Sequence, residues 1–243
     1  MADFRLISRL DIKNEWVIKG IEFEGVKRIG KLQNVLESYG ADWPIHEWLI
    51  LDAVASLYGR RPTWTRLNGV ADNVRVPMIV GGGIGSVEVA DQLFANGADR
   101  IFINTASIAF PYLLAELSEK YGRQAICAMV EAKKNRENWE ALYLGGREKS
   151  GKNVLDWVVE LQNHGAGEII LVSVDQDGTL NGPDWELVKK VRDLVSVSLV
   201  YGGGVASAND LEKLDVGVGC DGVAFSSLLH FKPAIASEIY KKY

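Results

Sequence analysis

Short runs of apolar residues alternate along the chain with longer segments whose apolar residues recur every three or four positions. The short runs are typical of buried β-strands, and the longer segments are typical of helices that cover a sheet. Eight strands are expected, at residues 5–10, 48–52, 77–80, 100–104, 125–130, 168–173, 198–201 and 222–225. Helices are expected in the intervals, at residues 31–39, 62–73, 86–96, 111–121, 153–164, 184–194, 208–213 and 233–241. This alternation predicts parallel βα units.

An internal repeat makes the architecture more specific. The segment VPMIVGGGIGS (residues 76–86) matches VSLVYGGGVAS (197–207), and LDIK (10–13) lies opposite VEAK (130–133) at nearly the same offset. Four strands are too few to bury their own sheet, so two such halves are expected to close on each other. We therefore predict an α/β fold in one domain spanning residues 1–243, a (β/α)8 TIM barrel built from two homologous half-barrels. An open, doubly wound sheet gives no reason for the duplication.

Composition narrows the class of protein. A chain of 243 residues that is 47% hydrophobic suits one large core, and a net charge of −5 without a basic run argues against a nucleic-acid partner. Cys127 and Cys220 both lie in apolar, strand-like contexts, which predicts no disulfide. The chain shows no signal peptide and no apolar run of about 18 residues, so a cytoplasmic protein without membrane contact is expected. The three scattered histidines predict no metal site, and no cofactor is expected.

Two glycine triplets mark candidate phosphate sites. They occupy residues 81–83 and 202–204, each between a predicted strand and a predicted helix. Glycine lets the backbone approach a ligand and point its N–H groups toward an anion. Side chains that can donate hydrogen bonds end the next strands: Asn104, Thr105, Ser226 and Ser227. Two such sites on one rim would suit an elongated substrate with a phosphate at each end, whereas the simpler alternative is that the glycines only form tight turns.

Two acids end equivalent strands of the two halves. Asp11 and Glu131 are expected at the carboxyl ends of the first and fifth strands, where TIM barrels place reactive groups. Between two phosphate sites they would form an acid/base pair, in which one carboxyl donates a proton and the other accepts one. The alternative is a pair of salt bridges to Lys13 and Lys133, two positions further along each strand.

The ordered motifs of the chain resemble those of a known family. RLDIK, VIKG, LDAVAS, VGGGI, NTAS, GGREKSG, SVDQDGT and LLHF together are similar to HisF, the cyclase subunit of imidazole glycerol phosphate synthase. The resemblance covers nearly the whole chain. It implies an enzyme of the lyase/cyclase class that receives ammonia from a glutaminase partner, as a heterodimer. Its substrate would be a bisphosphorylated ribulosyl aminoimidazole carboxamide, and its products imidazole glycerol phosphate and aminoimidazole carboxamide ribotide.

The resemblance also implies roles for individual residues. Asp11 matches the first catalytic aspartate of the family, and Lys19 matches a lysine of its mobile loop. Gly83, Asn104 and Thr105 match one phosphate site. The other half of the substrate site is matched by Asp177, Gly178, Gly203, Gly204 and Ser227, with Ser226 beside them.

A ring of charged residues is expected at the opposite end of the barrel. The family gates its ammonia passage there, and this chain has Arg5, Glu47, Arg100 and Glu168 at those positions. The alternative is a set of structural salt bridges on the stability face of the barrel. The sister isomerase of histidine biosynthesis shares the barrel, the two phosphate sites and the paired acids, so the ring favours a glutaminase-coupled protein over that isomerase.

The chain departs from the family pattern at several positions. Glu131 replaces the usual second aspartate, and its extra methylene moves the carboxyl by about 1 Å, enough to lower the rate about a hundredfold if nothing else shifts. Arg9 replaces a usual cysteine, Val172 a threonine and Gly202 a serine. The segment DWPIHE (residues 42–47) is longer than usual and lies toward the expected glutaminase face.

These departures leave two alternatives to the cyclase. One is an amidotransferase subunit that converts an acetamido sugar to an acetamidino sugar in surface-polysaccharide biosynthesis. The other is a non-catalytic barrel that binds a glutaminase. The charged segment KKNRENWEA (residues 133–141) is expected to be a solvated loop after the fifth strand.

Overall fold

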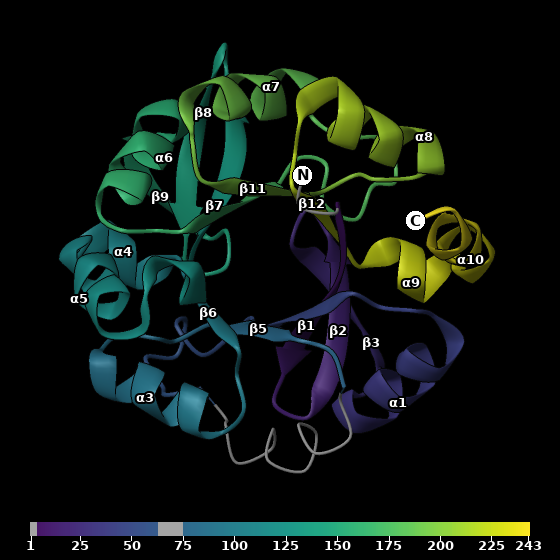
Figure 1. The fold of residues 1–243 in the computed structure, drawn as a ribbon, viewed down its shortest axis with the longest axis horizontal. Coiled ribbons are helices and arrows are strands. Elements are labelled where there is room, and N and C mark those ends of the chain that lie inside the picture. Colours follow the sequence, from purple (N-terminus) through teal and green to yellow (C-terminus); the bar gives the residue numbers. More distant parts are fainter. Residues whose placement is uncertain (1–3, 63–74) are drawn as a thin grey trace.

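A computed structural model describes residues 4–62 and 75–243, and within them eight parallel strands close into a barrel (Figure 1). The barrel strands are β1 (Arg5–Lys13), β4 (Glu47–Asp52), β5 (Met78–Gly81), β6 (Arg100–Ile103), β7 (Ile126–Asn135), β10 (Glu168–Ser173), β11 (Ser198–Gly202) and β12 (Gly222–Phe225). Pairing of β10 with β7 closes the ring. The predicted (β/α)8 barrel is confirmed, and each of the eight predicted strand ranges overlaps an observed barrel strand.

Helices surround the strands on the outside of the barrel (Figure 1). They are α1 (Leu32–Asp42), α3 (Val87–Ala95), α4 (Thr105–Ala109), α5 (Tyr112–Tyr121), α6 (Val154–Asn163), α7 (Trp185–Leu194), α8 (Ala208–Glu212), α9 (Ser227–Phe231) and α10 (Pro233–Lys242). A 3-10 turn, η2 (Arg123–Ala125), and a π-helical segment, η3 (Lys213–Val218), accompany them. The predicted helix at 62–73 lies outside the described residues except for Pro62. The short helices α4 and α9 were not predicted, and they follow the equivalent strands β6 and β12 directly.

The barrel strands read as continuous apolar runs because both of their faces are buried. One face packs against the helices, and the other fills the barrel interior. The interior layer consists of Ile7, Leu49, Ile79, Phe102, Cys127, Met129, Ile170, Val172, Val200 and Ala224. The centre of the barrel is therefore a packed apolar core between two more polar ends.

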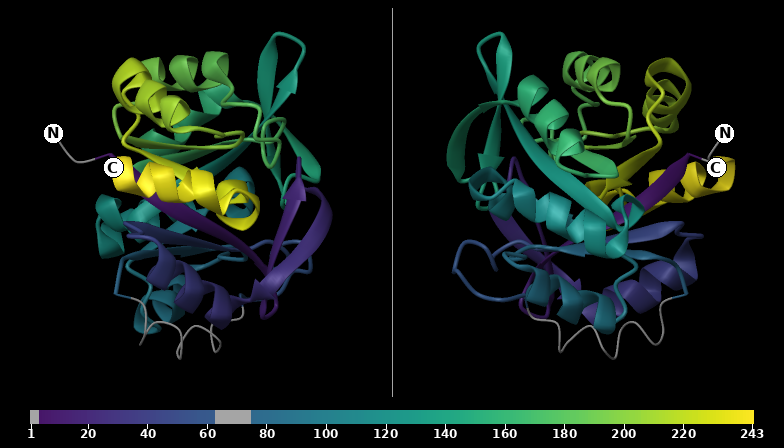
Figure 2. Two further views of the ribbon diagram at one scale, coloured as in Figure 1. Left: turned by 90° about the vertical axis from the view of Figure 1, so that its right-hand side faces the viewer. Right: turned by 60° about the vertical axis from the view of Figure 1, so that its left-hand side comes forward.

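Two antiparallel extensions follow the first and fifth barrel strands. The strands β2 (Trp16–Ile21) and β3 (Glu24–Lys31) extend β1, while β8 (Asn138–Tyr143) and β9 (Glu148–Asn153) extend β7. In the left view of Figure 2 both extensions lie on the right-hand side of the barrel. Their equivalent places agree with two homologous halves.

The prediction of a solvated segment at residues 133–141 is confirmed for residues 134–138, which are exposed, but the segment is a hairpin and not a loop, and its end is buried. This segment forms the end of β7 and the start of β8, and its Trp139 is 1% exposed. The indole Nε1 of Trp139 donates a hydrogen bond to Asp184 Oδ2 at 2.8 Å. The burial of Trp139 was not predicted, because charged residues surround it in the sequence. A short strand with only one packed face contains few apolar residues.

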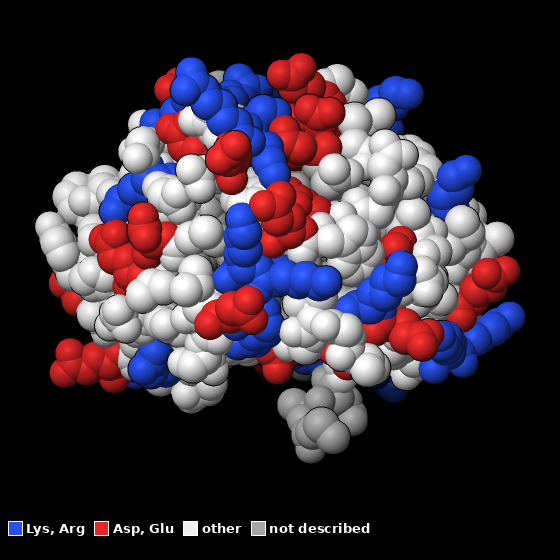
Figure 3. All heavy atoms as spheres, turned by 90° about the horizontal axis from the view of Figure 1, so that it is seen from above, with Lys and Arg blue, Asp and Glu red and all other residues white. Residues whose placement is uncertain are grey.

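Charges of both signs are mixed on the molecular surface. On the face toward which α7 lies, basic and acidic side chains sit side by side (Figure 3). Glu186 of α7, for example, pairs with Lys190 at 2.8 Å and with Lys134 at 2.9 Å. In the described part of the chain, none of the helices combines the length and apolar character needed to cross a bilayer.

Candidate active site

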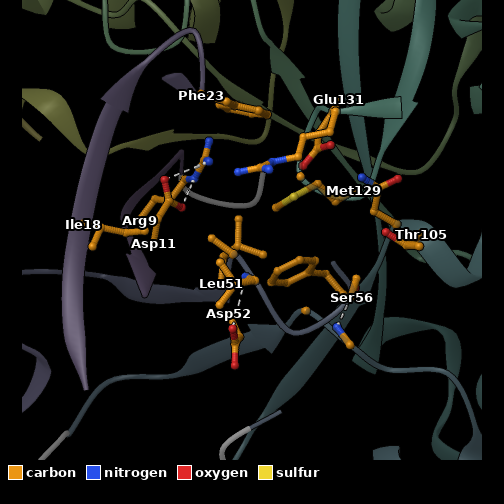
Figure 4. A pocket seen from close by; sticks show the side chains of 18 of the residues that line it. Arg9, Asp11, Ile18, Phe23, Leu51, Asp52, Ser56, Thr105, Met129 and Glu131 are labelled. Carbon is orange, nitrogen blue, oxygen red and sulfur yellow. Dashed lines mark hydrogen bonds and ion pairs between the residues drawn. The ribbon is translucent and has the colours of Figure 1, made fainter. Parts of the chain in front are cut away.

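A cavity of about 110 Å³ lies at the carboxyl ends of β1 and β4 to β7 (Figure 4), and we call it the main cavity. Its lining includes Arg9, Asp11, Lys19, Phe23, Gly83, Asn104, Thr105, Glu131, Arg147 and Asp177. Arg9 and Asp11 project from one side, and Glu131 projects from the other. This placement follows from strand alternation, since residues two apart on β1 share the inward face. The fold thus brings the two predicted catalytic acids to one cavity.

A network of four buried charges occupies one side of the main cavity. Arg9 donates two hydrogen bonds to Asp11, from Nε to Oδ1 at 2.8 Å and from an Nη to Oδ2 at 3.1 Å. A second Nη of Arg9 lies 3.4 Å from Asp177 Oδ1. Lys19 donates to Asp177, and its Nζ lies 3.9 Å from Asp11 Oδ2. The partners of Asp11 are therefore Arg9 and Lys19, and the alternative pairing with Lys13 is wrong.

The two acids have different electrostatic surroundings. Burial by itself raises the pKa of Asp11, but the charges of Arg9 and Lys19 outweigh burial and hold that pKa below its ordinary value. Burial raises the pKa of Glu131 to about 7, and the more distant charge of Arg9 only partly opposes it. Asp11 is therefore held in its ionised form, whereas Glu131 keeps its proton to a higher pH than an ordinary glutamate does.

Glu131 lacks the ion-pair contact that Asp11 has. Its Oε2 is buried and has no hydrogen-bond partner among the described residues. The Asn104 side chain and the backbone N–H of Gly146 lie close enough to favour its charged form. The alternative pairing with Lys133 is wrong, because Lys133 Nζ lies 3.2 Å from Asp175 instead. A buried carboxyl oxygen without a partner, at the wall of a cavity, is available to a ligand.

The β2–β3 hairpin folds over the mouth of the main cavity. The backbone N–H of Glu22 donates to the carbonyl of Asp177 at 2.8 Å. Phe23, at the turn, packs so closely on Gly146 that a Cβ there would lie 2.4 Å from the ring. The Arg9 guanidinium also lies 5.6 Å from the centre of the Phe23 ring. The hairpin, with Lys19 on β2, thereby joins both halves of the barrel across the cavity.

The first glycine triplet borders the main cavity beside Asn104 and Thr105. Gly82 and Gly83 have φ angles of 96° and 75°, which side chains rarely tolerate. A Cβ on Gly82 would lie 2.3 Å from the carbonyl oxygen of Asp52. The tight turn alone therefore requires these glycines, and it also leaves their backbone open to the cavity.

The second glycine triplet borders a separate, smaller cavity of about 20 Å³, the second cavity. Its lining includes Arg9, Asp177, Gly178, Gly203, Gly204, Ser226 and Ser227. Gly203 and Gly204 have φ angles of 111° and 79°, and Ser227 Oγ is buried without a hydrogen-bond partner in the described parts of the chain. The two cavities share Arg9 and Asp177, so the predicted phosphate-binding residues flank a common central cluster of charges.

The four predicted gate residues meet at the opposite end of the barrel. Glu47 accepts from Arg5 at 2.9 Å and from Arg100 at 3.3 Å. Glu168 pairs with Arg100 at 2.8 Å, and it also accepts from Arg5. Burial raises the pKa of Glu47 despite both arginines, while the same arginines overcome burial and lower the pKa of Glu168. The side chains form a closed ring of alternating charge below the apolar interior.

Sequence reasoning noted Arg9 only as a departure and did not include it among the site residues. The side chain is 2% exposed and lines both cavities. One signal could have found it, since Arg9 lies two positions before Asp11 on the same strand and must share its inward face.

Comparisons with known proteins agree with this geometry. A family model described as histidine biosynthesis protein matches residues 5–234. The imidazole glycerol phosphate synthase subunit HisF of Legionella pneumophila is 41% identical over 214 residues, covering 86% of this chain and 99% of the relative. The HisF subunits of Corynebacterium diphtheriae and Pyrobaculum aerophilum are 37% and 36% identical, each over 98% of this chain and 94% of the relative. The chain therefore belongs to the family of histidine biosynthesis proteins, as a HisF-like member.

Proposed function

We propose that this chain is the ammonia-dependent cyclase/lyase subunit of an imidazole glycerol phosphate synthase. Its substrate is a bisphosphorylated ribulosyl aminoimidazole carboxamide, and its products are imidazole glycerol phosphate and aminoimidazole carboxamide ribotide. The observation that carries this proposal is that Asp11 and Glu131 line one glycine-bordered cavity, which shares Arg9 and Asp177 with the second glycine-lined cavity. The HisF relatives named above support the same cyclase function in histidine biosynthesis.

The side chains suit a proton-transfer role between two anchored phosphates. The triplet glycines with Asn104 and Thr105 would hold one phosphate, and those with Ser226 and Ser227 would hold the other. Lys19, 3% exposed on β2 of the folded hairpin, would bring a positive charge beside the reacting carbon atoms. The hairpin over the mouth would exclude water while the ring closes.

A glutaminase subunit is the proposed partner, bound at the end of the barrel that carries the charged ring. Ammonia released there would pass the ring of Arg5, Glu47, Arg100 and Glu168 and enter the interior. The apolar interior layer favours neutral ammonia over ammonium, because burying an unpaired charge is strongly unfavourable. We place the complex in the cytoplasm.

Turnover with an ammonium salt and the bisphosphorylated intermediate tests the proposal without a partner. Product should form, and Asp11→Asn should abolish it. Asp193→Asn, an exposed aspartate of α7, is the matched control and should retain full activity. The absence of turnover at every ammonium concentration would reject the cyclase.

A second candidate is amidine formation on an acetamido sugar, and Arg9 is the observation that favours it. The Arg9 guanidinium lies between the two cavities, where a long bisphosphate would have to pass. The main cavity is larger than the second one, which suits a substrate that occupies the main cavity alone. Incubation with an acetamido sugar nucleotide and ammonium would then form the amidine, with the amide oxygen released as water, and mass spectrometry detects the product. A non-catalytic barrel is less well supported, because it gives no reason to keep a buried Glu131 carboxyl whose Oε2 has no hydrogen-bond partner among the described residues.

A further inference from the structure

Arg9 occupies the centre of the site but has no part in the roles assigned so far. It is 2% exposed, holds Asp11 through two hydrogen bonds, and reaches Asp177 at 3.4 Å. The contact with the Phe23 ring fixes the guanidinium from the hairpin side. The planar guanidinium contacts Asp11, Asp177 and the Phe23 ring, so it cannot rotate freely. Because Asp11 is bound to it at two points, the Asp11 carboxylate has one orientation in the cavity.

The charged surroundings of the two acids differ on every element that faces them. Asp11 faces Arg9 on its own strand, Lys19 on β2 and His230 on α9. The pKa of His230 is lowered to about 4, mainly by burial, so the imidazole is neutral near pH 7. Glu131 faces Arg9 and Asp11 from β1, together with the neutral Asn104 side chain and the Gly146 backbone. Arg147, in the connection between β8 and β9, also lines the main cavity.

We propose that Arg9 is a positioning residue that divides the two carboxyl groups into a base and an acid. Its guanidinium keeps Asp11 ionised and turned toward the cavity, while Glu131 carries the proton that the site donates. A substrate held between them gains a proton from Glu131 and loses one to Asp11, and exchange with water restores both groups. The substrate in this proposal is taken from the proposed function. The effect of Arg9 on the two carboxyl groups does not depend on that function.

The different pKa shifts agree with this division. The pKa of Asp11 is lowered and that of Glu131 is raised to about 7, and environments that separate two titrating groups in this way mark an acid and a base. Loss of the guanidinium should shift the pKa of Asp11 more than that of Glu131, because Asp11 accepts hydrogen bonds from it and Glu131 does not.

Carboxyl NMR titration of the isolated chain tests the proposal without substrate. Spectra of protein labelled at the carboxyl carbons of Asp and Glu are assigned with Asp11→Asn and Glu131→Gln. In the wild type Asp11 should titrate below Glu131, and in Arg9→Gln the Asp11 midpoint should rise by about one pH unit or more. Arg136→Gln, an exposed arginine at the turn between β7 and β8, is the control and should move neither midpoint.

Two outcomes of the titration would overturn the proposal. One is an Asp11 midpoint that stays in place when Arg9 is neutralised, and the other is a wild-type Glu131 that titrates below Asp11. If Arg9→Gln does not fold, Arg9→Lys keeps the charge but loses the two-armed grip, and a smaller rise of the same sign is then expected.

The pH profile of turnover then tests the roles. Activity of the wild type should fall above about pH 7, Glu131→Gln should remove that fall together with most activity, and Arg9→Gln should shift the acidic limb upward. A profile unchanged by Arg9→Gln would contradict the positioning role. If no substrate turns over, the proposed function fails, while the NMR titration still decides the role of Arg9.

Discussion

At Glu131, which we propose to be catalytic, one methylene group distinguishes the side chain from the aspartate of the family pattern. The backbone of Glu131 is held on both sides, by pairing with Val172 of β10 and Leu142 of β8. Because the backbone cannot follow, the longer side chain carries its carboxyl further into the main cavity than an aspartate would. There it approaches Arg9, which in turn grips Asp11. The two departures from the family pattern, Arg9 and Glu131, therefore belong to one cluster and are best understood together.

The raised pKa of Glu131 makes stability depend on pH. Between its ordinary value of 4.5 and about 7, the unfolded chain releases the proton while the folded chain keeps it, so stability falls as pH rises through this window. The predicted loss is about 3 kcal/mol in the free energy of unfolding, and it is complete above about pH 7. Urea unfolding at pH 5 and pH 8 measures it. Glu131→Gln should lack this part of the loss, and an equal loss in both proteins would contradict the assignment.

Gly204 should tolerate no side chain. Its φ is 79°, and a Cβ would lie 2.1 Å from the carbonyl oxygen of Gly182. Gly204→Ala should therefore lower the free energy of unfolding by at least about 1–3 kcal/mol. Gly85→Ala is the matched control, since Gly85 follows the first triplet and its Cβ would meet nothing within 4 Å. That variant should change stability by less than about 1 kcal/mol. Thermal unfolding of both variants gives the comparison.

At the scale of elements, the two hairpins complete the site that the barrel strands begin. The β2–β3 hairpin carries Lys19, and the β8–β9 connection supplies Gly146. They meet over the cavity at Phe23, so each half of the barrel contributes one wall of the mouth. The tip of the β2–β3 hairpin is fastened across the cavity through Glu22 and Phe23, and such a tip is a local unit that opens at a lower free energy than the barrel.

Removal of the Phe23 ring should loosen the first hairpin. In Phe23→Ala, hydrogen exchange at the Glu22 amide, which donates to Asp177, should accelerate roughly tenfold, corresponding to one or two kcal/mol of local stability. Exchange in the opposite hairpin, at Gly151, whose amide donates to Glu140 at 3.1 Å, should not change. Equal acceleration at both amides would indicate global destabilisation and not local opening.

At the scale of the whole molecule, the closed barrel separates two polar ends by an apolar core. The charged ring lies at one end, the paired acids lie at the other, and ten buried apolar side chains fill the space between them. Strand β1 carries a member of each group, since Arg5 and Asp11 share its inward face. A small neutral molecule would cross this apolar core at a lower free-energy cost than a charged one.

Opening the ring should uncouple the two ends. With a glutaminase partner bound, Arg5→Ala should lower glutamine-dependent turnover several-fold, because it breaks contacts to both Glu47 and Glu168. Turnover with added ammonium salt should stay near the wild-type rate, because the acids are untouched. Comparison of the two rates in one preparation is the measurement, with Arg136→Gln as control. If both rates fall together, the ring serves stability and not ammonia transfer.

The sequence by itself determined the barrel and its duplication. Buried parallel strands require continuous apolar runs, and the repeated triplets mark equivalent turns, so both features are written in local patterns. The repeat also placed Asp11 and Glu131 at the carboxyl ends of equivalent strands. Strand alternation puts Arg9 on the same face as Asp11, but it gives a direction and not a partner, so the contact between Arg9 and Asp11 was not predicted.

Only the tertiary structure decided which side chains contact the two acids and which segments cover the main cavity. The hairpins escaped prediction because they have one packed face and a mostly charged sequence, as Trp139 shows. Asp11 and Glu131 are both carboxyl groups on equivalent strands, and nothing local distinguishes them. Their difference arises from groups distant in sequence, since Lys19, Asp177 and Arg9 gather around Asp11 while Glu131 is left without an ion pair. Electrostatic environment depends on distances through space, and folding sets those distances.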